Sequence, residues 1–236
     1  MSGSTRYQQI IGDLLTRIAD SQQEKIKQAA AIIADHISAD GILYFLGSGH
    51  SVAIAMEGYY RAGGLAPVDV IYDPTFGRAE RVEGYAETII KDYNIPSGGI
   101  VVIVSNSGRN AFPIDVALYC KERGIRTIAI TSMAHSQSVT SRHSSGKRLF
   151  EIADIVIDNC GEPGDAILEI EGLPGRACPT SGIAGMFIVE SIIAQVIENL
   201  VKMGGEVPVF ISANVDGGDE HNEKLLEEYW HRIRGL

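Results

Sequence analysis

The chain has 236 residues, of which 45% are hydrophobic and 21% charged, a composition typical of folded proteins rather than disordered ones. Its formal net charge of -10 disfavours a nucleic-acid partner, because phosphate neutralisation needs clustered Lys and Arg. No uninterrupted apolar run approaches the roughly 20 residues that span a bilayer, and the polar start is unlike a signal peptide. We therefore expect a soluble, cytoplasmic protein with no membrane partner. The three cysteines show neither a disulfide framework nor a zinc-binding pattern.

Apolar residues at helical spacing open the chain. Two sets, at 10–18 and 26–37, are separated by a polar gap and predict two helices or one bent helix. Short apolar runs bounded by Gly, Pro, Ser or Asp follow, as expected of strands buried on both faces of a parallel sheet. The predicted strands are 42–46, 68–71, 100–104, 127–130 and 155–157.

Helix-compatible segments alternate with these strands. The predicted helices are 51–62, 79–92, 110–123 and a long apolar one at 182–203. The tail is interpreted as a strand at 207–211, a polar Gly-rich loop at 214–222 and an amphipathic helix at 223–233.

This alternation predicts an α/β fold, a three-layer α/β/α sandwich with a central, mainly parallel five-stranded sheet. Without a repeat or a long linker, one domain is expected over residues 1–236. It comprises an N-terminal helical segment at 1–40, an α/β core at 41–203, and a C-terminal strand, loop and helix at 204–236.

Polar residues follow three of the predicted strands at the points where the strands end. In open α/β sheets the ligand binds outside the carboxyl ends of the strands. Hydroxyls, closely approaching glycine backbone and helix N-termini together can hold a phosphate without a cation. The candidate binding residues are Ser48, Gly49, His50 and Ser51 after the first strand, Ser105, Asn106, Ser107 and Asn110 after the third, and Ser132 after the fourth.

These loops have two alternative interpretations. Each loop alone also fits helix caps and turns, which favour Ser, Asn and Gly. A nucleotide site is disfavoured, because the loop at 47–51 is neither the GxGxxG nor the Walker pattern. Three similar loops at equivalent strand ends favour a phosphate site.

A family resemblance supports this interpretation. Gly47-x-Gly49-x-Ser51, together with Ser105-x-Ser107-Gly108 opening a helix, resembles the SIS (sugar isomerase) domain of phosphosugar isomerases, phosphosugar lyases and sugar-phosphate-sensing regulators. This match covers 42 to about 159. A closer likeness, nearly end to end, is to a bacterial UPF family of phosphoheptose isomerase-like SIS proteins. It is carried by Gly49-His50-Ser51, Glu57, the segment 60–67, Thr131-Ser132, His135-Ser136, Ser141-Arg142-His143 and Gly164-Asp165-Ala166.

The resemblance implies the partners and the binding roles. The ligand would be a phosphorylated sugar, with Ser105, Asn106, Ser107 and Asn110 on the phosphate and Ser51 on the sugar or phosphate side. It also implies a homodimer or homotetramer with sites near the subunit interface. No cofactor and no metal are expected, since the histidines are too scattered for a recognisable ligand set.

Candidate catalytic residues follow from the chemistry of aldose–ketose isomerisation, which needs a base that moves a proton between adjacent carbons. Glu57, about two turns into the predicted helix at 51–62, resembles the glutamate that SIS isomerases place there, although it also fits a solvated helix position. Glu80 and Glu83 are rivals for the base that also fit first-turn helix stabilisation. His221 is a candidate ring-opening acid or base, at its own or a neighbouring site, or part of a turn before the last helix.

Three functions fit this sequence. The leading one is a sugar-phosphate isomerase with a carboxylate base. The second is a phosphosugar lyase, etherase or deglycase. The third is a non-catalytic sensor, although regulators with this domain usually carry a helix-turn-helix module and this chain has no spare basic domain for one.

Overall fold

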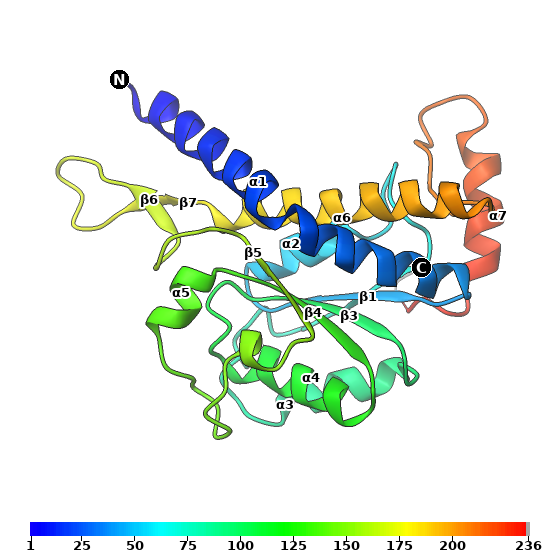
Figure 1. Ribbon diagram of the computed structural model, residues 1–236, viewed down its shortest axis with the longest axis horizontal. Helices are drawn as coiled ribbons and strands as arrows, with labels where there is room; N and C mark the ends of the chain where they lie inside the picture. Colours follow the sequence, from blue (N-terminus) through cyan, green and yellow to red (C-terminus); the bar gives the residue numbers. More distant parts are fainter. Residues whose placement is uncertain (235–236) are drawn as a thin grey trace.

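The computed structural model describes residues 1–234, in which a five-stranded parallel sheet lies between helical layers (Figure 1). The strand order is β2-β1-β3-β4-β5, and every neighbouring pair is parallel. The strands are β1 Leu43–Gly47, β2 Val68–Ile71, β3 Ile100–Val104, β4 Arg126–Thr131 and β5 Ile155–Asp158. The predicted α/β architecture is confirmed. The last two residues of the predicted domain, 235–236, lie outside the described residues.

Helices cover both faces of the sheet. On one face lie α1 (Gly3–Ser38), α2 (Ser51–Glu57) and α6 (Ser181–Met203), and on the other lie α3 (Tyr85–Ile90) and α4 (Ala111–Glu122) (Figure 1). The short α5 (Met133–Ser138) follows β4, and α7 (Gly218–Tyr229) lies at the opposite end of the molecule (Figure 1). Two 3-10 turns, Lys91–Tyr93 and Leu149–Glu151, and a small antiparallel hairpin of β6 (Ala166–Leu168) and β7 (Ala177–Pro179) complete the fold.

The sheet divides the core into two clusters because side chains alternate along each strand. Phe45 points to the side of α1, α2 and α6, whereas its neighbour Leu46 points to the side of α3 and α4, and both are fully buried. α6 is long and apolar enough, by length and composition alone, to cross a membrane. Its inward face, including Ile188 and Ile192, is part of the first cluster, as expected of a core helix.

Several predicted element boundaries are wrong for identifiable reasons. The N-terminal segment is the single helix α1. The predicted helix at 51–62 ends at Glu57, since Gly58 follows and Tyr60 takes a left-handed φ of 38°. The predicted helix at 79–92 is helical only from Tyr85, because Gly84 has a φ of 78° and interrupts it. The β6–β7 hairpin was not predicted.

The C-terminal region also differs from its prediction. The segment at 207–211 is not a strand and makes only one antiparallel bridge, between Val209 and Leu65. Pro208 has no N–H to donate, and the segment bonds irregularly to the turn around Gly64. The last helix begins at Gly218, five residues earlier than predicted, and ends at Tyr229.

The contact between α2 and α6 gives a test of the packing. A Cβ added to Gly185 of α6 would lie 2.6 Å from Ile54 Cδ1 of α2 and 2.9 Å from its Cγ2. Gly185→Val should therefore lower the free energy of unfolding by about 1–3 kcal/mol through overpacking. Gly12→Val in α1 is the control, because nothing lies within 4 Å of a Cβ there. Measured by urea denaturation, the free energy of unfolding of the control should stay within about 0.5 kcal/mol of that of the parent. Equal losses of stability in both variants would contradict the described packing of α2 against α6.

Candidate functional site

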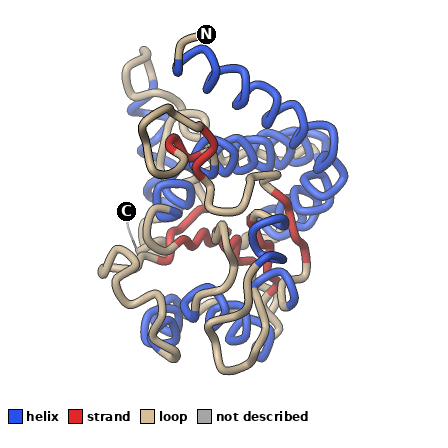
Figure 2. The backbone as a smooth tube through the Cα atoms, turned by 90° about the vertical axis from the view of Figure 1, so that its left-hand side faces the viewer, coloured by secondary structure: helices blue, strands red, loops and turns tan. Residues whose placement is uncertain are grey.

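The loops that follow β1, β2, β3 and β4 converge at the carboxyl edge of the sheet. Figure 2 views the molecule from this side, where the strands end among loops and helix ends. α2 begins at Ser51 and α4 at Ala111, directly after the first and third loops. Unpaired N–H groups at the start of such helices favour an anion. The backbone at this edge of the sheet is therefore suited to binding a negatively charged group.

Two glycines bring the first two loops together. Gly49 has a left-handed φ of 59° and Gly77 one of 82°. A Cβ added to Gly77 would lie 2.7 Å from Gly49 Cα and 2.8 Å from Gly49 N. The turn after β2 therefore lies directly against the backbone of the first loop, a contact that no side chain could occupy.

Asp73 holds this turn in place. Its carboxylate is fully buried and accepts hydrogen bonds from Thr75 N (2.9 Å), Thr75 Oγ1 (2.7 Å), Gly77 N (2.8 Å) and Tyr85 Oη (3.1 Å). Ser48 Oγ of the first loop also donates to it, at 3.4 Å. Burial opposes ionisation, but these hydrogen bonds hold the pKa of Asp73 below its ordinary value. Asp73 therefore acts as a buried anion that orders two loops, a role that the sequence analysis did not assign.

The third loop presents free hydroxyls. Within residues 1–234, the side chains of Ser51 and Ser107 form no hydrogen bond with the protein, and both residues are partly exposed. Ser105 Oγ accepts from Gly108 N at 3.2 Å, which leaves its own proton to donate. Gly108 is close-packed, because an added Cβ would lie 3.1 Å from Ser136 Oγ and 3.2 Å from Leu149 Cβ. Ser105 and Ser107 can therefore donate to a ligand beside the start of α4, and Ser51 can donate at the start of α2.

Two of the predicted binding side chains serve the protein instead. Ser132 is fully buried, where its Oγ donates to Gly161 O (2.6 Å) and accepts from His135 N (3.0 Å), so its side chain is engaged within the protein. Asn106 Oδ1 accepts from Asn159 Nδ2 at 2.8 Å, which ties the third loop to the end of β5. The strand-end position was correct in both cases, but the direction of the side chain was not predictable from it.

Glu80 is the carboxylate that the fold places among these loops. Its Oε1 accepts from Asn110 Nδ2 at 2.7 Å, so the predicted binding residue Asn110 is used to orient Glu80. Its Oε2 would lie 3.8 Å from a Cβ added to Gly49 in the first loop. Burial raises the pKa of Glu80 above its ordinary value, although the charges of Arg81 and Arg142 oppose the shift. A partly buried carboxylate with a raised pKa suits a general base.

The other candidate carboxylates face elsewhere. Glu57 is the last residue of α2, about 9 Å along the helix from Ser51. It forms an ion pair with Arg61, which also lies 3.3 Å from Glu190 of α6. Glu83 accepts from Ser144 N at 2.7 Å and from its hydroxyl. Within one chain, the structure brings Glu80 to the serine loops and does not bring Glu57 or Glu83 there.

His221 lies on α7, at the far end of the molecule from α5 and the serine loops (Figure 1). Its Nε2 is 2.9 Å from Val209 O, so the ring is used to hold the C-terminal segment. The structure therefore does not bring His221 to the serine loops of its own chain. A role at a neighbouring subunit stays a prediction.

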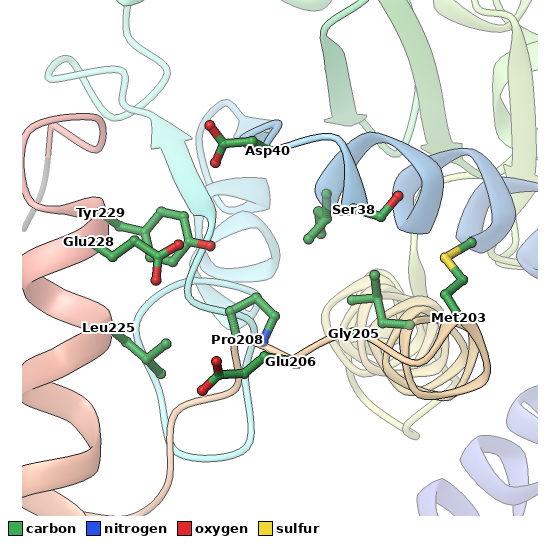
Figure 3. A pocket seen from close by; sticks show the side chains of 11 residues that line it. Ser38, Asp40, Met203, Gly205, Glu206, Pro208, Leu225, Glu228 and Tyr229 are labelled. Atoms are coloured by element: carbon green, nitrogen blue, oxygen red, sulfur yellow. The ribbon is translucent and has the colours of Figure 1, made fainter.

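A cavity of about 330 Å³ lies beside α7 rather than at the serine loops. Figure 3 shows Asp40, Glu206 and Glu228 around it, with Leu225 and Tyr229 from α7. Asp40 precedes β1 and pairs with Arg232 at 2.6 Å, so this cavity belongs to the amino-terminal edge of the sheet. Its acidic rim makes it unsuited to a phosphate.

The start of α6 is a part of the site that the sequence analysis missed. A Cβ added to Gly182 would lie 3.8 Å from His50 Nε2 of the first loop. Asp165 fixes this helix start by accepting from Thr180 N (3.0 Å) and from Ser181 N (2.8 Å) and Oγ (2.6 Å). Thr180-Ser181 before an apolar helix was the available signal. His50 is exposed here and can donate to a ligand oxygen.

Residues 1–234 contain no group of three His, Cys, Asp or Glu side chains arranged to hold a metal ion. Two buried polar atoms near the third loop, His135 Nδ1 and Ser136 Oγ, have no hydrogen-bond partner among the described residues. Burial, and then the charge of Arg109, lower the pKa of His135, so its neutral form is favoured.

Comparison with known proteins places the chain in a class and then in a family. The sequence profile of the SIS domain matches residues 6–132, more than half of the chain. The protein is therefore a SIS domain protein. A UPF0309 protein of Shouchella clausii is 42% identical over 243 residues and is aligned over 99% of both chains. One of Oceanobacillus iheyensis is 40% identical over 237 residues, covering 96% of each. The chain belongs to the UPF0309 family.

Solved structures share the fold at low identity. A phosphoheptose isomerase from Francisella tularensis superposes with a TM-score of 0.58 at 14% identity, over 83% of this chain and 98% of the other. The sugar isomerase domain of an RpiR transcription factor from Sphaerobacter thermophilus superposes with a TM-score of 0.52 at 16% identity. The superposition covers 98% of this chain and 99% of the other. These similarities establish the SIS-like fold, and they include both an enzyme and a regulator.

The role of Asp73 can be tested by its pH dependence. Asp73→Asn should lower the free energy of unfolding by about 2–3 kcal/mol at pH 7, because it removes the charge that several donors solvate. A folded-state pKa below the ordinary 3.8 stabilises the protein above that pH, and the contribution is lost as the pH falls through the lowered pKa. The gap between variant and parent should thus stay constant from about pH 7 to 5 and shrink below about pH 4.

Urea unfolding across that pH range measures the gap, with the exposed Asp13→Asn as the control that should stay close to the parent throughout. A gap that widens as the pH falls would show that Asp73 does not have a lowered pKa.

Proposed function

We propose that the protein binds a phosphorylated sugar at the carboxyl edge of its sheet and isomerises it between aldose and ketose forms. The observation that carries the proposal is that three free or partly free hydroxyls, those of Ser51, Ser105 and Ser107, lie at or just before helix starts, in the two loops that the Glu80 carboxylate also approaches. The SIS-like fold, shared with phosphoheptose isomerases, supports it.

The binding step uses neutral donors. A phosphate ester seated at the third loop would accept from the hydroxyls of Ser105 and Ser107 and from N–H groups at the start of α4. Hydrogen bonds to a charged acceptor contribute about 1.5–3 kcal/mol each, so a few suffice for micromolar binding once the entropy cost is included. Ser51 and His50 would face the sugar from the first loop.

The chemical step is a proton transfer. Ionised Glu80 removes the proton from the hydroxyl-bearing carbon next to the carbonyl, and the carbonyl oxygen takes up a proton from solvent, which gives an enediol. Glu80 then returns its proton to the former carbonyl carbon, while the neighbouring hydroxyl loses its proton to solvent and becomes the new carbonyl, so no atom is gained or lost. Asn110 orients the carboxylate, and burial raises its proton affinity toward that of the carbon acid. Glu57 and His221 remain candidates only for a site completed by a neighbouring subunit.

A sensor is the second candidate function, supported by the shared fold with the RpiR regulator domain. It predicts the same phosphosugar binding with no turnover. A lyase, etherase or deglycase would bind the same ligand class but would release a substituent. Product analysis after incubation with sugar phosphates distinguishes the three.

The binding residues can be tested by thermal shift with glucose 6-phosphate, fructose 6-phosphate and sedoheptulose 7-phosphate. The ligand that stabilises the parent most should bind Ser107→Ala about 10- to 100-fold more weakly, because one charge-assisted hydrogen bond is lost. Ser38→Ala, at the other end of the sheet, is the matched control and should bind as the parent does. Equal affinity of Ser107→Ala and the parent would place the phosphate elsewhere.

The base can be tested by solvent exchange. In D2O the parent should incorporate deuterium at the carbon next to the carbonyl, and Glu80→Gln should lose about 100- to 10,000-fold of that rate while still binding ligand. Gln can still accept from Asn110, so the loop should keep its geometry. The rate should fall as the pH falls through a pKa above the ordinary 4.5 of glutamate. If Glu57→Gln loses exchange and Glu80→Gln keeps it, the base is Glu57.

A further inference from the structure

Three arginines gather on one side of the third loop. Arg109 and Arg142 are joined by a backbone hydrogen bond from Arg142 N to Arg109 O at 2.8 Å. The guanidinium of Arg142 donates to Asn110 Oδ1 at 2.9 Å, and Asn110 in turn donates to Glu80 at 2.7 Å. Arg81 follows Glu80 in the chain. Burial, and then the charges of Arg109 and Arg81, lower the pKa of Arg142 from its ordinary value.

These charges are not neutralised by the protein. In the described part of the chain, no carboxylate oxygen lies within 4.0 Å of any of the three guanidinium groups. Arg109 donates only to the backbone and hydroxyl of Thr140, at 2.9 and 3.5 Å. Arg81 donates to no acceptor within residues 1–234. Other arginines of the chain are also unpaired, but here three are clustered.

The acidic groups nearby are already engaged. Glu80 faces Arg81 and Arg142, and one of its oxygens is held by Asn110. Asp73 accepts hydrogen bonds from the turn after β2, and Glu83 accepts from Ser144 N. Asp115 accepts from Gly84 N, and its other oxygen lies 2.9 Å from His143 Nε2. Among the described residues, none of these carboxylates therefore forms an ion pair with the three arginines. Grouping like charges is costly unless an anion joins them.

The serine loops do not need these cations. Hydroxyls and helix starts can hold a phosphate ester alone, as in the proposed site. Arg81 belongs to the turn at 78–84, Arg109 to the third loop itself, two residues after Ser107, and Arg142 to the segment that follows α5. Guanidinium groups match carboxylate and phosphate oxygens in a bidentate manner, which hydroxyls cannot do.

We propose that Arg81, Arg109 and Arg142 form a second anion subsite, so that the substrate is a sugar phosphate that carries a further anionic group, either a carboxylate or a second phosphate. This inference rests on the proposed function, because the second anion would belong to the same ligand whose ester phosphate the serine loops bind. Glu80, joined to Arg142 through Asn110, would lie beside this subsite.

The test compares ligands that differ by one anionic group. Calorimetry on the full-length protein measures Kd for fructose 6-phosphate against fructose 1,6-bisphosphate, and for glucose 6-phosphate against 6-phosphogluconate. The ligand with the second anion should bind at least about tenfold more tightly in at least one pair. The pair that shows the preference identifies the second group as phosphate or carboxylate.

Arg81→Gln is the informative variant, because Arg81 makes no contact that the fold needs. It should reduce the preference about tenfold, through weaker binding of the doubly anionic ligand. Arg126→Gln at the start of β4 removes the same charge at the opposite edge of the sheet and should keep the preference. Ser107→Ala should raise Kd for both ligands of a pair by the same factor, since it removes a contact with the ester phosphate that both ligands share.

The outcomes separate the two proposals. If monophosphates bind and no second anion improves affinity, the subsite is overturned and the proposed function stands. If Arg126→Gln reduces the preference as much as Arg81→Gln, the effect is net charge alone and the subsite is overturned. If no sugar phosphate binds, with or without a second anion, both proposals fail.

Discussion

The close contact between the backbones of Gly77 and Gly49 is the constraint on which the site depends. It requires two glycines with left-handed φ, and it is held by the buried carboxylate of Asp73, which takes hydrogen bonds from both sides of the contact. Because the turn after β2 is fixed against the first loop, the chain that continues from Gly77 brings Glu80 to the serine loops. The contact fixes Glu80 relative to the first loop, and the hydrogen bond from Asn110 fixes it relative to the third.

An acidic protein that binds an anion must arrange its donors locally. The ester phosphate can be met by neutral groups, the hydroxyls of Ser105 and Ser107 and the start of α4, which add no net charge. The positive charge of the region is concentrated in a separate group of arginines beside Asn110. Within residues 1–234, Glu80, the proposed base, forms no ion pair with these arginines. In our proposal the arginines bind a second anionic group of the ligand.

Much of the fold followed from the sequence. Buried apolar runs such as 100–104 identified all five strands of the sheet, because strands covered on both faces have an unmistakable composition. The strand ends then indicated the candidate site, since the carboxyl edge is where loops converge in this architecture. Helix ends were less predictable. Gly84 interrupts a helix whose composition is otherwise suitable, and Pro208 prevents the predicted last strand.

The site was predictable in position but not in the roles of its side chains. Ser132 and Ser107 occupy similar places in the sequence, yet one is buried as a helix cap and the other has a free hydroxyl. Glu57 was favoured over Glu80 because it lies on the helix after the first loop, but its side chain faces α6 and Arg61. The position of Glu80 depends on the Gly49–Gly77 contact, which joins residues 28 apart and has no local signature. A role for His221 would depend on contacts with a neighbouring subunit, which a single chain does not show.

A crystal structure of the protein with its tightest-binding sugar phosphate tests the central claim most directly. The account predicts the ester phosphate at Ser105, Ser107 and the start of α4, with a Glu80 oxygen within hydrogen-bonding reach of the carbon that loses its proton. A ligand seated in the cavity beside α7, or a phosphate at the third loop with the sugar turned away from Glu80, would contradict it.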